Sequence, residues 1–321
     1  MSYELSKDDF VICDGFEKYI SKFEEEVLRA FIVDSGYDVP VSHYTSADGL
    51  LNILKTSKLR FTEASCLNDN TEGTYIFDVL KDFLKNDSEI ASDFKDAIFA
   101  ELEKGEFNNI YDVDCKRYFI CCFSFDDDSL PLWNYYTKNP NMKGYNIQFN
   151  YVEFSLDLMA YNTNHSGNMY YEGYKIIYQK QDQINCIKVI LDYIAQVWGK
   201  TKSNLIIKLF LNYLNSIRFT FKHFAFEPEK EIRFVIKVKE SFFQNELKAN
   251  AANDEIIKLQ LKGDMVAPYI EIPFSKKGVK AIRVSPLIKD KAAIDSLKLV
   301  LNKYGYNEKI PINSSEIPLK Y

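Results

Sequence analysis

One stretch, RYFICCFSF at residues 117–125, constrains the fold more than any other part of the sequence. It is apolar throughout after its first residue and carries no further charge. A run of this length and composition is typical of a strand buried on both faces. The segment therefore predicts the central strand of a sheet.

Further β-type runs and helical patterns surround this strand. The β-type runs are KLRFT, GYNIQFN, MYYEGYKIIYQ, EIRFVIKV, IIKLQL, YIEIP and AIRVSP. Apolar residues recur at helical spacing over residues 16–32, 46–56, 75–104, 182–219 and 289–304. We therefore expect an α+β fold, with a mixed, mainly antiparallel sheet core and flanking helices.

The domain organisation follows from the absence of any repeat or of a linker rich in Pro, Gly or Ser. We expect an N-terminal helical extension over residues 1–39 and a single α+β domain over residues 40–321, with a helical insertion at about 182–219. The 321 residues are 46% hydrophobic, enough to bury a large core.

Charge and cysteine content narrow the classes of function. The formal net charge is −6, so no overall basic field attracts nucleic acid or an anionic membrane. The acidic N-terminus lacks a secretory signal, and no apolar run reaches membrane-spanning length. Six scattered cysteines contain no C-x-x-C pair, which indicates reduced thiols. We expect a cytoplasmic protein with no membrane partner.

The stretch VSHYTSADGLLNIL at residues 41–54 places polar side chains at a strand end. Ser46 can cap the apolar helix that follows, so His43, Tyr44 and Thr45 lie where a strand meets that helix. Strand ends commonly present side chains to ligands. The alternative is that His43 is a core histidine with its hydrogen bonds satisfied, and this stretch alone favours that alternative.

Two loops carry clustered acidic residues. In LNDNTEG, the polar residues Asn68, Asp69 and Glu72 could line a site or could form a turn that caps the next helix. In CFSFDDDSLPLWNYY, three aspartates follow the central strand; they could ligate a cation, although a charge run is usually a solvated turn.

Two aromatic residues follow the three aspartates. Trp133 and Tyr136 are three residues apart on a short helix behind Pro131, so they face the same way. They could pack in the core or form a platform for an aromatic ligand.

The segment FEPEKEIRFVIKV holds the sharpest pattern. Glu229, Glu231 and Arg233 alternate, so on a strand all three would project from one face. Paired carboxylates repel, which raises the pKa of one member and suits acid–base chemistry or binding of a hydroxylated ligand. A surface ladder of little energetic value is the alternative, and the pattern alone favours it.

The ordered motifs together resemble a bacterial family, domain of unknown function 2971. They are H-Y-T with an apolar helix, L-R-F-T, N-D-x-x-E, C-F-S, W-x-x-Y, G-Y-x-I-x-F, F-K-H-x-x-F-x-x-E-x-E-x-R, RVSP and SSEIPLKY. The resemblance covers about residues 40–321. This chain has Ser285-Pro286 where the family commonly has Gly-Pro, and Lys320 where it commonly has Arg.

A more distant resemblance links H-x-T, GLLNIL and the late E-x-E to the ADP-ribosyltransferases, including DNA-modifying toxins. It implies an ADP-ribosyltransferase-like fold, NAD as substrate, and an NAD-dependent ADP-ribosyltransferase or NAD glycohydrolase activity, in a toxin or phage-defence effector. The macromolecular acceptor is not indicated.

The resemblance also assigns roles. His43 would bind ribose, Glu231 would be the catalytic carboxylate, and Glu229 would orient the acceptor. Tyr136 or Tyr44 would clamp nicotinamide, and Arg60 would face the diphosphate. The remaining residues expected to bind the nucleotide are Thr45, Asn68, Asp69, Trp133 and Arg233.

Other classes of function stay open or are disfavoured. The same scaffold could be a non-catalytic module that senses a nucleotide or a partner. Asp69, Glu72, Glu229 and Glu231 could instead serve a metal-dependent hydrolase. The sequence has neither the glycine-rich Rossmann fingerprint nor a G-x-S-x-G elbow, which argues against a classical dehydrogenase and an α/β-hydrolase.

Overall fold

The computed structural model describes most of the chain. The described residues are 6–27, 39–67, 71, 73–105, 115–137, 143–165, 167–248 and 255–319. Two compact units emerge from the Cα packing. A helical unit comprises residues 1–33, 69–115 and 174–225, and a sheet unit comprises residues 34–68, 116–173 and 226–321.

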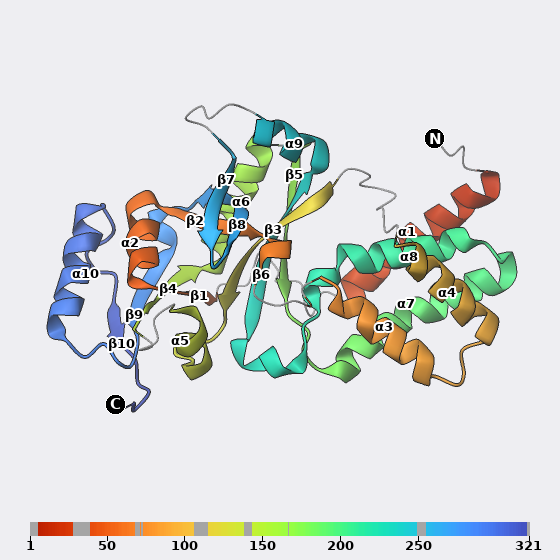
Figure 1. The fold of residues 1–321 in the computed structure, drawn as a ribbon, viewed down its shortest axis with the longest axis horizontal. Helices are drawn as coiled ribbons and strands as arrows, with labels where there is room; N and C mark the ends of the chain where they lie inside the picture. The colour runs from red at the N-terminus through yellow and green to blue at the C-terminus, as the bar shows by residue number, and fades with distance from the viewer. Residues whose placement is uncertain are drawn as a thin grey trace. The chain divides into compact units, whose positions relative to one another are not determined.

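Five α-helices build the described part of the helical unit (Figure 1). They are α1 (Lys7–Glu26), α3 (Tyr75–Asn86), α4 (Ser92–Lys104), α7 (Lys180–Thr201) and α8 (Asn204–Ser216). Ser6 and Asp9 form a reciprocal capping box that begins α1. Helix α8 buries residues on most of its circumference, because α1, α4 and α7 pack around it.

A short parallel β-bridge joins two further segments of the helical unit. Ile177 pairs with Phe221, and the buried Gln183 side chain donates Nε2 hydrogen bonds to the carbonyls of Ile177 (2.7 Å) and Lys222 (2.9 Å). One amide therefore ties both chain segments to the first turns of α7.

The described strands form one ten-stranded sheet. They are β1 (Pro40–Thr45), β2 (Lys58–Glu63), β3 (Cys115–Ser124), β4 (Tyr145–Asn150), β5 (Met169–Lys175), β6 (Glu231–Lys239), β7 (Ile257–Lys262), β8 (Met265–Pro273), β9 (Val279–Val284) and β10 (Ile312–Ser314). The main path runs β10-β9-β4-β1-β3-β2-β8-β7, and β6 pairs with both β3 and β5.

Strand β3 is the branch point of this sheet. Its Ser124 pairs antiparallel with Ser42 of β1, whereas its Ile120 pairs antiparallel with Thr62 of β2. Strand β6 is a third neighbour. Such a strand is shielded on all sides, which explains why the run RYFICCFSF has no polar alternation. The prediction of a central strand was confirmed.

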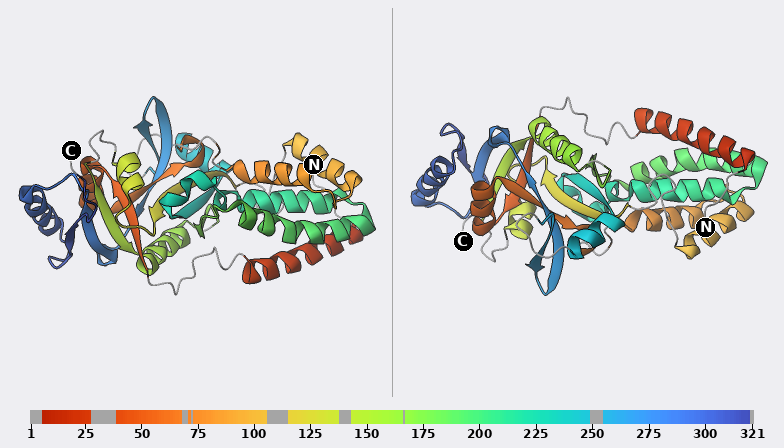
Figure 2. Two further views of the ribbon diagram at one scale, coloured as in Figure 1. Left: turned by 90° about the horizontal axis from the view of Figure 1, so that it is seen from below. Right: turned by 90° about the horizontal axis from the view of Figure 1, so that it is seen from above.

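The remaining helices belong to the sheet unit. They are α2 (Ala47–Thr56), α5 (Leu130–Tyr136), α6 (Tyr151–Asn164), α9 (Glu240–Lys248) and α10 (Lys291–Lys303). Strands β7 and β8 form a hairpin that projects from the rest of the sheet (Figure 2).

One face of the sheet is an aromatic core beneath α6. Phe154 of α6 contacts three strand residues, Phe123, Phe149 and Phe234, at ring-centroid distances of 5.2, 5.9 and 5.0 Å. All four rings are buried. We call this side of the sheet the aromatic face. Because side chains alternate along a strand, the neighbours of these aromatic residues project from the opposite face.

The predicted α+β fold with a mixed, mainly antiparallel sheet was confirmed. Among the described pairs with a resolved register, only β10 and β9 run parallel. The helices expected over residues 182–219 are α7 and α8, which lie in the helical unit with α1, α3 and α4. The division into residues 1–39 and 40–321 stays a prediction.

Phe234 provides a test of the aromatic face. Phe234→Ala should lower the free energy of unfolding by about 3–5 kcal/mol, because it removes a fully buried ring and leaves a cavity. Urea denaturation followed by circular dichroism measures the change. Leu261→Ala, at a side chain that is 82% exposed, should change it by less than about 0.5 kcal/mol. Equal losses would contradict this packing.

Candidate functional site

A turn of three aspartates follows β3 and organises the site. In this aspartate loop (Asp126–Asp128), the Asp126 carboxylate pairs with Lys230 at 3.0 Å. Asp127 Oδ2 accepts hydrogen bonds from Arg283 at 2.7 Å and from Gln148 at 2.5 Å. The first two carboxylates therefore bind protein cations and an amide while staying partly exposed.

The third aspartate binds the C-terminal segment. Asp128 Oδ1 accepts from the indole Nε1 of Trp133 (2.8 Å) and from Ser315 Oγ (2.6 Å). Its Oδ2 accepts from the backbone N–H of Glu316 at 2.7 Å. We call residues 314–319 the C-terminal strap. The aspartate loop thus serves as an internal anchor.

Helix α5 is held against this loop by aromatic packing. Trp133 is fully buried and meets the Tyr44 ring edge-on, with centroids 4.7 Å apart. The Tyr44 hydroxyl donates to the carbonyl of Asp126 and accepts from the N–H of Ser129, both at 2.9 Å. Tyr44 and Trp133 are consequently core residues of the loop, and Tyr136 is the aromatic residue nearer to the glutamates.

The backbone before β6 differs from the prediction. Glu229 ends a 3₁₀ turn (Phe224–Glu229), Lys230 has a left-handed φ of 42°, and β6 begins only at Glu231. The expectation that Glu229 and Glu231 occupy alternate positions of one strand was wrong. Hydrogen bonds hold the strained residue: the N–H of Lys230 donates to Glu227 O, and its carbonyl accepts from the N–H of Phe125, both at 3.0 Å.

Both glutamates nevertheless lie near Tyr136. The Tyr136 hydroxyl donates to Glu229 Oε1 at 2.9 Å. Arg233 donates to both oxygens of Glu231, at 2.8 and 3.0 Å. Glu229, Glu231 and Arg233 are 8%, 5% and 0% exposed, so a surface ladder is excluded. We call these four residues the β6 polar cluster.

The electrostatics of the cluster act on the tyrosine. Burial raises the pKa of Tyr136, and the nearby negative charges of Glu229 and Glu231 raise it further. The phenol therefore remains a hydrogen-bond donor at neutral pH. The two carboxylates differ in their shown partners, since Glu231 has a bidentate guanidinium and Glu229 has the phenol.

His43 projects away from this cluster. Its ring lies 5.4 Å from that of Phe123, and its Nδ1 lies 3.1 Å from the carbonyl oxygen of Cys122. Phe123 in turn contacts Phe234 on the aromatic face. Because side chains alternate along β6, Glu231 lies on the opposite face of the sheet from Phe234 and hence from His43. The histidine and the glutamates do not converge.

Arg60 and Thr45 also lie elsewhere. Arg60 contacts Glu271 at 3.4 Å and Gln260 at 3.1 Å, and its guanidinium lies over the Tyr269 ring. Thr45 ends β1 beside Gly49 of α2. Asn68, Asp69 and Glu72 lie outside the described residues.

Three residues that hold the aspartate loop were missed in the sequence analysis. Asn146 donates to the carbonyl of Asp127 at 2.7 Å, and its register partner Arg283 and nearby Gln148 bind the Asp127 carboxylate. The alternation in GYNIQFN indicated that Asn146 and Gln148 share a face. Pairing with a turn about twenty residues earlier depends on strand register, which no local pattern reveals.

The described residues contain neither a cluster of metal-ligating side chains nor a membrane-spanning helix. There, His, Cys, Asp and Glu side chains do not gather in threes or more around a point that could hold a metal ion. None of the described helices combines the length and hydropathy needed to cross a bilayer. The cysteines whose side chains are described are all free thiols.

The fold and the cluster define an α+β protein in which a half-buried tyrosine, a buried arginine and two buried glutamates gather beside the start of one strand. Residues 132–234 match the sequence model of the family described as "Protein of unknown function (DUF2971)", which confirms the first resemblance over that range. The range contains the whole β6 polar cluster. No curated protein matches the chain, and no solved structure matches it.

Asp128 offers a test of the anchor. Asp128→Ala should lower the free energy of unfolding by about 2–4 kcal/mol, because it leaves the Trp133 indole and the strap without their charged acceptor. Urea denaturation measures this loss, and tryptophan emission should shift to longer wavelength. Asp264→Ala, at an exposed turn, is the matched control and should change neither.

His43 predicts a pH dependence of stability. Burial lowers its pKa below the ordinary 6.5, so the unfolded chain binds the proton more tightly. Stability should therefore fall as pH decreases below about 6.5, by up to about 1.4 kcal/mol per pH unit from this group. Denaturation at pH 7 and at pH 5 should show that the free energy of unfolding decreases less between these pH values for His43→Asn than for wild type. Equal losses would show that His43 is not the group responsible.

Proposed function

We propose that the β6 polar cluster binds NAD or a related nucleotide and supports cleavage of the bond between nicotinamide and ribose. The observation that carries the proposal is the 2.9 Å hydrogen bond from Tyr136 to Glu229. It joins an aromatic ring to a buried carboxylate. A ring can stack on nicotinamide, and a carboxylate can stabilise the positive charge that develops on the ribose.

The reaction needs few components. Nicotinamide departs with the bonding electron pair, C1 of the ribose gains positive charge, and a nucleophile adds to C1 and loses a proton. Water as nucleophile gives an NAD glycohydrolase, and a macromolecular acceptor gives an ADP-ribosyltransferase. We place this activity in the cytoplasm, and the resemblance to toxins makes cell extract the first source of acceptors to assay.

Compared with the roles that the resemblance implies, we exchange those of the two glutamates. Two buried hydrogen bonds join Glu231 to Arg233, which fits a positioning role. Glu229 Oε1 instead contacts the Tyr136 phenol, whose ring would stack on nicotinamide. Glu229 is given the catalytic role, and Glu231 positions Arg233. His43 receives no role, because it lies on the aromatic face.

A second candidate function is a sensing module without catalysis. The Glu231–Arg233 pair favours it, since the side chains are 4% and 1% exposed and satisfy one another as a structural ion pair does. Such a module would bind the nucleotide and release no nicotinamide.

Nicotinamide release from NAD, with and without cell extract, tests the enzyme. Glu229→Gln should reduce release by about a hundredfold or more, because it keeps the shape and removes the charge. His43→Asn should retain activity within about threefold. Circular dichroism confirms that both variants are folded.

The remaining outcomes separate the two candidates. Activity that survives in Glu229→Gln and disappears in His43→Asn would overturn the site assignment. A rise in melting temperature with NAD, lost in a folded Tyr136→Ala protein that lacks the stacking ring, together with no release in wild type, would identify the sensing module.

A further inference from the structure

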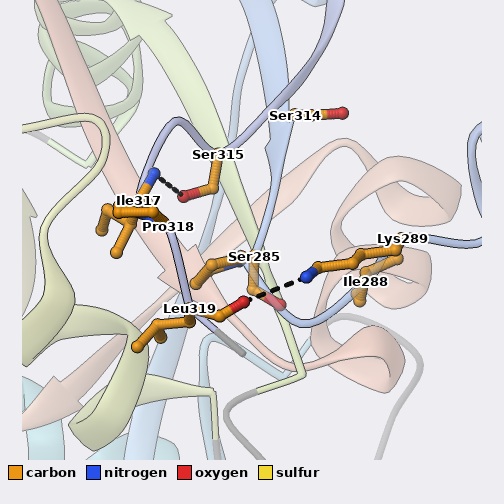
Figure 3. A pocket seen from close by; sticks show the side chains of 9 residues that line it. Ser285, Ile288, Lys289, Ser314, Ser315, Ile317, Pro318 and Leu319 are labelled. Carbon is orange, nitrogen blue, oxygen red and sulfur yellow. Dashed lines mark hydrogen bonds between the residues drawn. The ribbon is translucent and has the colours of Figure 1, made fainter. Parts of the chain in front are cut away.

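The turn after β9 and the C-terminal strap enclose a pocket of about 320 Å³ in the sheet unit (Figure 3). One wall is formed by Ser285, Pro286, Ile288 and Lys289, and the other by residues of the strap. Ser285 and Pro286 belong to the motif RVSP, and the strap residues belong to the motif SSEIPLKY, two motifs that the β6 polar cluster does not use. Two late sequence motifs therefore come together around one space.

The strap is a fixed wall of this pocket. Arg283 donates to the carbonyl of Ser314 at 3.0 Å, and Asp128 holds Ser315. Ile317 and Leu319 pack against the buried cluster around Trp133. The pocket thus has rigid supports on the strap side, which reduces the ordering cost of binding.

Two polar side chains of the lining, Lys289 and Ser285, can donate hydrogen bonds. Lys289 uses one of its three ammonium hydrogens on the carbonyl of Leu319, at 3.0 Å. The Ser285 hydroxyl accepts from the N–H of Gly144 at 3.2 Å, so its own hydrogen can still donate. Lys289 is the one ionised side chain among the lining residues described. The pocket therefore favours a single negative charge.

Besides Ser314 and Ser315, the rest of the lining is apolar. Pro286, Ile288 and Pro318 present hydrocarbon surface, and the volume lies at the low end of the range for small-molecule sites. We propose that this pocket binds a small organic carboxylate with a compact apolar body. The carboxylate would meet Lys289 and the Ser285 hydroxyl, and the apolar body would lie against the proline and isoleucine side chains. This site is independent of the function proposed for the β6 polar cluster.

The test uses the full chain, with benzoate as the carboxylate probe and benzamide as its neutral counterpart. Ligand-observed NMR titration should show that benzoate binds at least about tenfold more tightly than benzamide. Lys289→Met keeps the hydrocarbon stem and should weaken benzoate binding by about tenfold or more. Lys291→Met, at an exposed position outside the lining, should leave it unchanged.

A filling variant locates the site. Ile288→Trp should abolish the binding of benzoate, with circular dichroism as the folding control; if this variant does not fold, the Lys289→Met and Lys291→Met pair decides. Absence of benzoate binding at millimolar concentration would overturn the proposal. So would equal affinity for benzamide, equal losses in both lysine variants, or binding that persists in a folded Ile288→Trp protein.

Discussion

The sheet unit depends on the way its chain neutralises three consecutive aspartates. Adjacent carboxylates repel, and burying them without partners would be costly. Each of Asp126, Asp127 and Asp128 instead binds donors from a different part of the chain. Solvent screens the partly exposed Asp126 and Asp127 pairs, so the main effect is geometric: a single turn ties α5, the β4–β9 ladder and the C-terminal strap together.

The β6 polar cluster follows from this anchor. Ser124, the last residue of β3, donates its hydroxyl to the carbonyl of Glu229 at 2.6 Å and accepts from the N–H of Asp126. Lys230 adopts its left-handed backbone between the same two segments. The glutamates are consequently held by the loop that also positions Tyr136. Strain concentrated beside a buried polar network is a common property of functional sites, and it supports the choice of this cluster.

Several elements could be predicted because their signal is local. The apolar run that became β3, the Pro131 start of α5 and the helices α7 and α8 all follow from periodicity and capping. The resemblance left the aromatic residue of the site open between Tyr136 and Tyr44, and the contact of Tyr136 with Glu229 appears only in the structure. The roles taken from the resemblance would need His43 and Arg60 beside the glutamates, but His43 lies on the aromatic face and Arg60 pairs with Glu271 of a neighbouring strand.

By itself, the sequence determined the α+β class, the central strand and the composition of the cluster, since hydrophobic periodicity and residue type act over a few neighbours. Only the tertiary structure decided which face each polar residue occupies. A shift of one residue in strand register reverses every side chain, and the left-handed Lys230 moves Glu229 off the strand. Those choices depend on partners far apart in the chain, such as Arg283 for Asp127, and no local pattern contains them.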